Sequence, residues 1–350
     1  LLNQILCFIT KLAGRLTVMT KSEIHELFKS FNDLTCLIIG DVMVDAYIWG
    51  KVNRISPEAP VPVFEARKRE NRLGGAANVA LNIQALGAKP ILCGIIGKDI
   101  KGNVFETVLK EQNLSDEGII KSQERLTTCK TRIISSSHHM LRVDEEIVEP
   151  INQEDSKELI QRVKSLAESK EIDVVIFEDY DKGVLNAKNI QEIISFLNEK
   201  EIPICVDPKK DNFLNYQGAT LFKPNFKEFT NGLKEEIKKG DINALMQHAQ
   251  KFISQQAIKN IMITLSEHGV LLYNEKQQIH IPAELRNISD VSGAGDTVIS
   301  IASLAYCLGV RGKELATLVN LAGGLVCEEV GVVPINKERL EHEFIKRTEQ

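Results

Sequence analysis

Apolar and polar residues follow two different periods along the chain. From Thr35 onward, short apolar runs of strand length are separated by segments whose apolar residues recur at helical spacing. The runs expected to form strands are TCLIIGD, KPILCGIIG, DVVIFED, IPICVDP, ATLFKPN, IMITL, GVLLY and QIHIPA. Runs rich in Val, Ile and Leu that alternate with helices predict a mostly parallel sheet with helices on both faces. The expected fold class is therefore α/β, and ligands should bind beyond the carboxyl ends of the strands.

Helical spacing recurs between these runs and again in the carboxyl-terminal part of the chain. The expected helices are AANVALNIQALG, KGNVFETVLKEQ, QEDSKELIQRVKSLAES, NAKNIQEIISFLNEK and INALMQHAQKFISQQ, followed by residues 296–309, 313–329 and 336–348. Two stretches, residues 46–73 and 124–145, break the alternation and resemble short strands. Both follow strand–helix elements, so we expect them to form a small sheet that projects from a single domain spanning residues 19–350.

Residues 1–18 stand apart from this pattern. Their apolar stretch is shorter than the ~20 residues of a membrane-spanning helix, and no positive charge precedes it as in a secretory signal. We expect an over-extended or disordered start to the chain, with an amphipathic helix as the alternative. No other segment of the sequence is typical of a membrane span.

Composition removes several classes of function. The 350 residues carry 43 Lys and Arg against 48 Asp and Glu, a formal net charge of −5, which disfavours a nucleic-acid-binding protein. The seven cysteines form no C-x-x-C pair, and the seven histidines form no H-E-x-x-H motif. Reduced thiols in a cytoplasmic protein are the favoured interpretation, and a transition-metal centre is not expected.

The segment with the clearest chemistry is Asp290–Asp296, D-V-S-G-A-G-D, which precedes the apolar helix TVISIASLAYCLG. Gly293 and Gly295 allow a tight turn whose backbone amides, with the start of the following helix, form an anion hole for a phosphoryl group. Asp296 lies at its rim, where a carboxylate can accept a proton from an attacking hydroxyl. The alternative is that Asp296 only caps the helix.

With this segment, the chain resembles the ribokinase/PfkB family of sugar kinases, whose signature is D-T-x-G-A-G-D. The resemblance implies a ribokinase-like three-layer α/β/α sandwich with a small β-sheet lid, in which Asp296 is the catalytic base and Gly293, Ala294 and Gly295 form the anion hole. The segment R-L-G-G-A-A-N-V-A matches the family's amino-terminal glycine pair. The sugar-binding residues implied by the resemblance are Asp45, Gly74, Gly75 and Asn78. Taken alone, the glycine pair is typical of a tight helix start, and Asp45 of a turn.

Three further segments resemble the nucleotide site of the family. Asn225-Phe226-Lys227-Glu228 matches its N-x-x-E motif, which organises Mg²⁺ and the phosphates of ATP, although a bare N-x-x-E is usually a helix cap. Thr264, Ser266 and Gly269 stand where the family commonly has T-x-G-x-x-G, with Ser266 replacing its first glycine. Asn320 and Gly323 resemble the wall beside adenine, with close helix packing as the alternative. The resemblance also implies a monovalent cation, K⁺, near Asp290.

The segment R-I-S-P-E-A-P-V-P at residues 54–62 narrows the resemblance to bacterial kinases of D-glycero-β-D-manno-heptose 7-phosphate. The activity implied is ATP-dependent phosphorylation at O1, on the route to the ADP-heptose of lipopolysaccharide. A sugar phosphate needs cationic partners, and Arg142 and Lys209 are favoured over Arg54 and Lys182, each being otherwise a solvated surface residue. No H-x-G-H motif is present, so we expect a separate adenylyltransferase to act on the product.

A homodimer formed through the edges of the small sheet is the expected assembly, with no membrane partner. Two other functions stay open at this stage: a PfkB kinase for another sugar or nucleoside, and a sensor that binds nucleotide or sugar phosphate without turnover. A dinucleotide oxidoreductase is disfavoured, because G-D-V-M after the first strand is not G-x-G-x-x-G.

Overall fold

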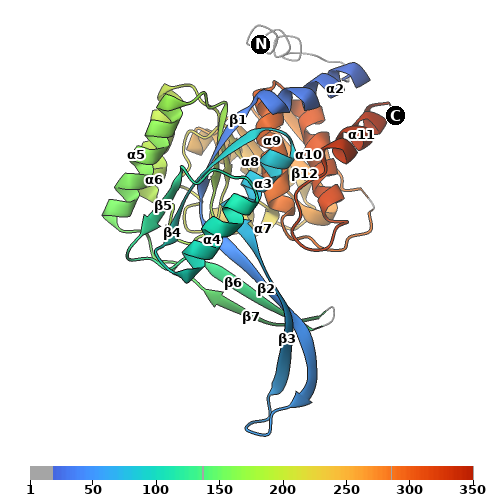
Figure 1. The fold of residues 1–350 in the computed structure, drawn as a ribbon. Coiled ribbons are helices and arrows are strands. Elements are labelled where there is room, and N and C mark those ends of the chain that lie inside the picture. The colour runs from blue at the N-terminus through green and yellow to red at the C-terminus, as the bar shows by residue number, and fades with distance from the viewer. Residues whose placement is uncertain (1–18, 136–137, 285, 350) are drawn as a thin grey trace.

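A nine-stranded sheet crosses the computed structural model, which describes residues 19–135, 138–284 and 286–349 (Figure 1). Its strand order is β13-β12-β11-β10-β9-β8-β1-β4-β5. Strands β11, β12 and β13 pair antiparallel, and every other neighbouring pair is parallel. The bounds are β1 Thr35–Gly40, β4 Lys89–Gly97, β5 Ile119–Ser122, β8 Val174–Glu178, β9 Ile204–Asp207, β10 Leu221–Phe222, β11 Asn260–Thr264, β12 Val270–Asn274 and β13 Gln277–Ile281. The predicted mostly parallel sheet is confirmed.

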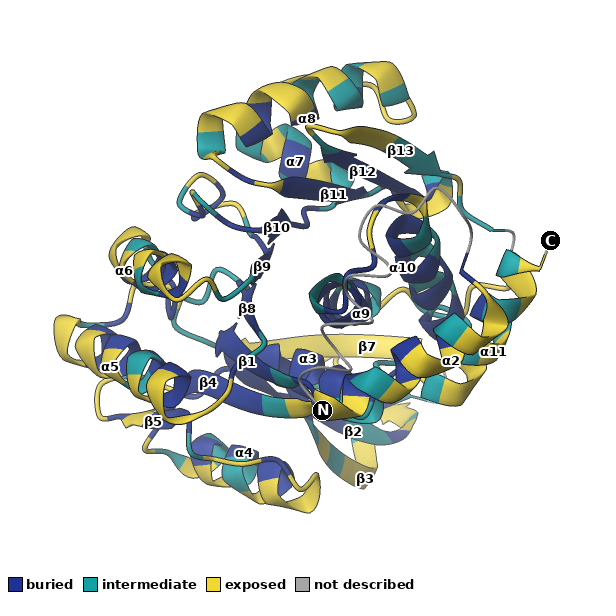
Figure 2. Ribbon diagram, turned by 90° about the horizontal axis from the view of Figure 1, so that it is seen from above, coloured by how far each residue is buried: buried dark blue, intermediate teal, exposed yellow. Residues whose placement is uncertain are grey.

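Helices cover both faces of this sheet, because successive strand residues point to opposite sides (Figure 2). In β1, Cys36 and Ile38 pack into one apolar core, while Leu37 and Ile39 pack into the other. The first core is closed by α2 Lys21–Ser30, α3 Ala76–Ala85, α4 Ile100–Glu111, α9 Ala294–Cys307, α10 Gly312–Val326 and α11 Lys337–Thr348. The second is closed by α5 Gln153–Ser169, α6 Ala187–Glu199, α7 Phe226–Leu233 and α8 Ile242–Gln256. The three-layer α/β/α prediction is confirmed.

A second sheet of four strands projects from the main body as an arm (Figure 1). Its order is β3-β2-β6-β7, with bounds β2 Val42–Ile55, β3 Pro62–Gly75, β6 Cys129–Ser135 and β7 His138–Glu145. Strands β2 and β3 pair along their whole length, from Val42 opposite Gly75 to Ile55 opposite Pro62. The small sheet expected from the two irregular stretches is therefore present, and β2 begins only one residue after β1 ends. Its base consequently lies directly at the carboxyl edge of the main sheet.

Asp41, the residue between β1 and β2, fixes the loop that follows β8. Its buried carboxylate accepts hydrogen bonds from the backbone amides of Tyr180 (2.8 Å), Lys182 (3.2 Å) and Val184 (3.1 Å). A buried carboxylate needs such donors to offset the loss of water. The loop after β8 is thereby held against the start of the small sheet.

Two sequence-based expectations concern cysteines and membranes. The six cysteines within the described residues are free, four of them buried, as expected for reduced thiols. In the part of the chain that the structure describes, no helix is both long enough and apolar enough to cross a membrane. The expectations for residues 1–18, Cys7 included, lie outside the described residues.

Candidate active site

The glycine-rich segment forms a turn at the amino terminus of α9. Gly293 is the cap residue of this helix and has φ 80°, a left-handed conformation that favours glycine. The first turn of a helix leaves backbone amides without intrahelical partners and carries the positive end of the helix dipole. Asp296 lies in this first turn. The glycine-rich turn and the Asp296 carboxylate therefore lie next to each other at the carboxyl edge of the sheet.

Two donors orient the Asp296 carboxylate, which is buried. Asn78 of α3 donates to Oδ2 at 2.5 Å, and the Tyr180 hydroxyl donates to Oδ1 at 2.9 Å. The pKa of Asp296 is raised from 3.8 to about 6, mainly by burial and also by the charge of Asp207, while the hydrogen bonds from Asn78 and Tyr180 act in the opposite direction. At neutral pH the group is thus an ionised carboxylate that can accept a proton.

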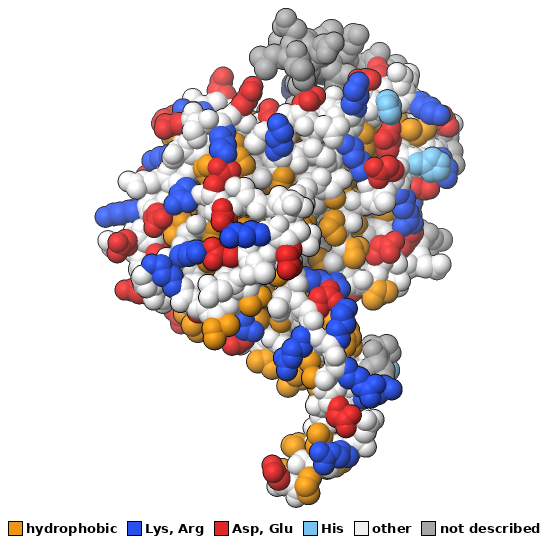
Figure 3. Space-filling model, in the orientation of Figure 1, with side chains coloured by type: hydrophobic (Ala, Val, Ile, Leu, Met, Phe, Trp, Pro, Cys, Tyr) orange, Lys and Arg blue, Asp and Glu red, His pale blue; other side chains and the backbone are white. Residues whose placement is uncertain are grey.

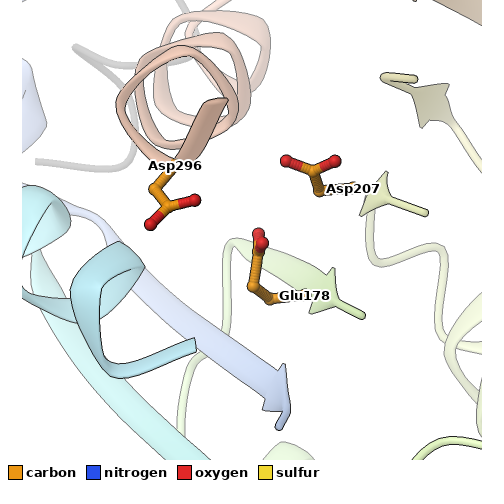
Figure 4. Close-up of side chains that lie close together, drawn as sticks. All are labelled: Glu178, Asp207 and Asp296. Carbon is orange, nitrogen blue, oxygen red and sulfur yellow. The ribbon is translucent and has the colours of Figure 1, made fainter. Parts of the chain in front are cut away.

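Glu178 and Asp207, at the ends of β8 and β9, face Asp296 across a short gap (Figure 4). Each of the three buried residues offers an oxygen that lies within 4.8 Å of the others. Lys223, also buried, pairs with Asp207 through Nζ and Oδ2 at 2.8 Å. Burial raises the pKa of Glu178 well above its usual range, and the charges of Asp207 and Asp296 add to this effect. Three carboxyl groups thus lie close together beside the glycine-rich turn, and burial together with its acidic neighbours opposes the ionisation of Glu178.

The N-x-x-E segment caps helix α7 from its amino-terminal end. Asn225 accepts a hydrogen bond from the Glu228 amide (2.9 Å), and Glu228 Oε2 accepts one from the Asn225 amide (2.8 Å). Glu228 Oε1 pairs with Lys209 Nζ at 2.7 Å. Phe226 is half-buried, and Lys227 is exposed. The helix cap that the sequence left open as an alternative is therefore present, with a half-buried rather than solvated glutamate.

The other candidate nucleotide-binding residues form two groups. The Thr264 amide donates to Pro224, so the turn containing Ser266 and Gly269 lies beside the N-x-x-E segment. Ser266 adopts φ 53°, a conformation that glycine adopts at less cost. On α10, Asn320 donates to the Pro282 carbonyl, and a Cβ at Gly323 would lie 3.1 Å from Val298. The α10 pair thus makes the packing contacts proposed as its alternative role.

The candidate sugar-binding residues do not all come together. Asp45 is buried on β2 and pairs with Arg132 at 2.5 Å, and a Cβ at Gly74 would lie 2.5 Å from the Asp45 carboxylate. Gly75 caps α3, the helix that carries Asn78. Arg142 lies on exposed β7, and its guanidinium forms two hydrogen bonds to Asp144. The cation beside Asp45 is therefore Arg132 rather than Arg142.

Of the remaining candidate residues, Lys182 and Asp290 have defined partners, whereas Arg54 is described only by its exposure. Lys182 pairs with Glu146 at 2.9 Å, and Arg54 is exposed near the end of β2. Asp290 accepts hydrogen bonds from the amides of Ser292 (2.9 Å) and Gly331 (3.1 Å). Asp290 therefore joins the glycine-rich turn to the loop after α10.

Sequence analysis assigned no role at the site to five residues that the structure places there: Glu178, Tyr180, Asp207, Lys223 and Arg132. The first four stand at or directly after the carboxyl ends of β8, β9 and β10. That position was already expected to hold the ligand site, and a charged or polar residue directly after an apolar run is the signal. Arg132 carries no such signal, because its role depends on the pairing of β2 with β6.

A nine-stranded α/β/α sandwich with a buried aspartate in the first turn of a helix is the arrangement expected of a phosphotransferase. Residues 33–339 match the model of the pfkB family carbohydrate kinases, and the chain belongs to this family. It is therefore a sugar kinase, and kinases of this family use ATP and a divalent metal.

Curated relatives include proteins named Bifunctional protein HldE. The one from Desulfatibacillum aliphaticivorans is 37% identical over 326 residues, which cover 92% of this chain and 65% of the relative. The one from Helicobacter pylori strain G27 is 38% identical over 296 residues, which cover 84% of this chain and 63% of the relative. The chain thus spans less than two thirds of the length of these relatives. Because they are named bifunctional, they do not support the expectation of a separate adenylyltransferase.

Solved structures share the fold at low sequence identity. Phosphofructokinase-2 from Escherichia coli in complex with potassium superimposes with a TM-score of 0.73 at 16% identity, covering 91% of this chain and 99% of that one. Ribokinase from Thermotoga maritima superimposes with a TM-score of 0.65 at 17% identity, covering 89% of this chain and 99% of that one. The ribokinase-like fold is confirmed.

Proposed function

We propose that the chain transfers the γ-phosphoryl group of ATP to O1 of D-glycero-β-D-manno-heptose 7-phosphate, giving the 1,7-bisphosphate for the synthesis of ADP-heptose. Membership of the PfkB family and 33–38% identity to proteins named HldE support this assignment. The segment R-I-S-P-E-A-P-V-P favours heptose over other sugars. We place this reaction in the cytoplasm, where thiols stay reduced.

The observation that carries the proposal is the placement of Asp296 in the first turn of α9, beside the Gly293–Gly295 turn. In the proposed reaction, Asp296 accepts the proton of the O1 hydroxyl as that oxygen attacks the γ-phosphorus. The amides of Gly293, Ala294 and Gly295 then stabilise negative charge on the transferring group. Asn78 and Tyr180 hold the carboxylate in one orientation.

On the sugar side, we propose that Asp45 accepts hydrogen bonds from sugar hydroxyls and that Gly74 and Gly75 allow the small sheet to close. Asp45 already has Arg132 as a partner, which holds its carboxylate in one orientation. Lys209 is the candidate cation for the sugar phosphate, and Arg142 would have to leave Asp144 to join it. Closure of the sheet would exclude water, the competing phosphoryl acceptor.

Mg²⁺ bound to ATP supplies charge neutralisation and orients the phosphates. Asn225 and Glu228 fit a hydrated ion, because their oxygens hold the helix cap and keep further lone pairs for metal-bound water. Asp290 fits a supporting role for K⁺, since its carboxylate joins the two loops that would surround such an ion. Stimulation of turnover by K⁺ over Na⁺ tests the latter proposal.

The test of the function is ATP turnover by the purified protein with Mg²⁺, comparing heptose 7-phosphate, fructose 6-phosphate, ribose and adenosine. We expect selective turnover of heptose 7-phosphate and a loss of about 10²–10⁴-fold in kcat for Asp296→Asn, with little change in ATP binding. Asp241→Asn is the matched control, because Asp241 caps α8 on the surface.

Turnover of another sugar would contradict the heptose assignment while leaving the kinase mechanism in place. Binding of heptose 7-phosphate and ATP without turnover would instead identify a sensor. Full activity of Asp296→Asn would contradict the proposed base.

A further inference from the structure

A network of charged side chains joins helix α11 to the segment that precedes the glycine-rich turn. Its members are Glu284, Arg286, Glu328, Glu329, Arg339 and Arg347. Arg286 is central, because its Nη1 donates to Glu328 at 2.8 Å and its Nη2 donates to Glu284 at 2.9 Å. Glu328 also pairs with Arg339 of α11. Glu284 also accepts a hydrogen bond from Arg347 of the same helix, at 2.9 Å.

The Arg286 side chain is only 14% exposed and lies against α10. A Cβ at Gly324 of this helix would lie 2.9 Å from Arg286 Cδ and 3.1 Å from Nε. Nε is buried and has no hydrogen-bond partner among the described residues. A buried donor without a partner is costly, so the two carboxylates hold the guanidinium at a place that packing alone would not favour.

The segment of residues 286–293 is not fixed by apolar burial. Its two large apolar side chains, Ile288 and Val291, are 66% and 67% exposed. Its contacts are polar: besides the ion pairs of Arg286, the amides of Ser289 and Asp290 donate to the Cys327 carbonyl at 2.8 and 3.2 Å. These contacts attach the segment to the carboxyl-terminal end of α10, where Glu328 directly follows Cys327.

The same segment ends at Gly293, the cap residue of α9. We propose that Arg286 is a positioning residue for the glycine-rich turn, because it fastens the segment leading into that turn to α10 and, through its glutamate partners, to α11. Several charges in a network hold a structure more firmly than an isolated surface pair. A turn that is held in advance loses less conformational freedom when phosphates bind, so nucleotide affinity should depend on Arg286. The effect on nucleotide rests on the proposed kinase function, whereas the effect on the turn does not.

Hydrogen–deuterium exchange over residues 286–293, measured by mass spectrometry on the full chain without nucleotide or sugar, tests the positioning. Arg286→Met removes the charge, and both glutamates keep their partners on α11. We expect exchange in this segment to become at least about threefold faster, because local opening becomes easier. The difference from the wild type should shrink at about 0.5 M NaCl, since salt screens partly exposed ion pairs.

A second readout is the dissociation constant of adenylyl imidodiphosphate with Mg²⁺, a non-hydrolysable analogue of ATP. It should rise at least about threefold in Arg286→Met. Arg162→Met is the matched control, because Arg162 is also partly buried and pairs with Glu158 on α5. Its loss should change neither exchange over residues 286–293 nor the affinity for the analogue.

Unchanged exchange over residues 286–293 in Arg286→Met would overturn the proposal, as would equal acceleration in Arg162→Met. If circular dichroism shows that Arg286→Met is unfolded, Gly324→Ala decides, because its added methyl displaces the Arg286 stem while favouring the helical state of α10. Unchanged exchange there would equally overturn the proposal. Failure of the wild type to bind the analogue would contradict the kinase function, but the exchange experiment contains no nucleotide and would still decide the inference.

Discussion

Asp296 depends on side chains from two other elements for its orientation. Asn78 reaches it from α3, and Tyr180 reaches it from the loop after β8, which Asp41 in turn holds through backbone amides. Each donor stabilises the ionised carboxylate and limits its rotation. Tyr180 therefore acts as a positioning residue for the proposed base.

The acid limb of the pH profile follows from the environment of Asp296. Since burial raises the pKa of this carboxyl from 3.8 to about 6, the base becomes protonated below about pH 6. We expect kcat/KM to fall about tenfold per pH unit below that point, and not only below pH 4 as for an exposed aspartate. Initial rates between pH 5 and 8 with saturating Mg²⁺ provide the measurement. A flat profile down to pH 5 would exclude Asp296 as the titrating base.

Tyr180→Phe removes one donor from the ionised form of Asp296 and leaves the ring in place. The pKa of Asp296 should rise, because hydrogen bonds to a carboxylate lower its pKa. We expect the acid limb to move to higher pH and the loss of kcat/KM to be larger at pH 6 than at pH 8.

Tyr216→Phe is the control for this prediction. Tyr216 is also buried, and its hydroxyl donates to Asp179 at 2.7 Å rather than to Asp296. Its removal should lower stability without moving the acid limb. Equal shifts in the two variants would show that Tyr180 acts only through general packing.

At the scale of elements, helix α7 starts with a reciprocal cap that uses the motif residues Asn225 and Glu228. The cap satisfies two backbone amides that would otherwise lack partners. It also holds Glu228 in reach of Lys209. The pair Asn225 and Glu228 thus caps α7 and also lies beside the turn formed by residues 264–269.

Asn225→Ala should lower the free energy of unfolding by about 1 kcal/mol, because the cap is lost. Asn225→Asp retains an acceptor at the same position and should recover most of the stability. Chemical denaturation of the three proteins measures this difference. If the KM for ATP rises in both variants although Asp restores stability, the amide itself serves the nucleotide; if KM follows stability, the residue acts as a cap.

The sequence patterns predicted most of the helices and strands, but not all of the side-chain contacts at the candidate site. The apolar runs located eight strands of the main sheet but not β5 (Ile119–Ser122), whose two isoleucines are followed directly by Lys121 and Ser122. The glycine-rich turn and Asp296 were found because spacing along the chain encodes them. Tyr180 contacts Asp296 and Arg132 contacts Asp45, and both partners are distant in sequence. A single sequence does not show which distant residues come into contact, so these two roles could not be predicted.

For the whole molecule, the projecting arm exposes apolar side chains at its tip (Figure 3), where Ile55 and Val61 are exposed. Strands β3 and β7 are its edges, and Met140, Leu141 and Val143 of β7 are exposed, Leu141 by 57%. Exposed strand edges with apolar side chains favour pairing with another chain. These features support the proposed homodimer through the small sheet.

Leu141→Asp should therefore shift the protein toward the monomer, because a charge would be buried in the interface. Light scattering coupled to size-exclusion chromatography measures the mass. Leu214→Asp, at an exposed apolar position on the turn after β9, should leave the mass unchanged. A monomeric wild type, or a Leu141→Asp protein that remains dimeric, would contradict this interface.

The hydrogen bond between Asn78 and Asp296 joins residues 218 positions apart, and that between Tyr180 and Asp296 spans 116. Contacts between such distant positions form slowly, since a large loop must close before they contribute. During refolding, helical content should return before a correctly held base does. Regain of catalysis would then report completion of the whole chain's folding, whereas circular dichroism would report only its beginning.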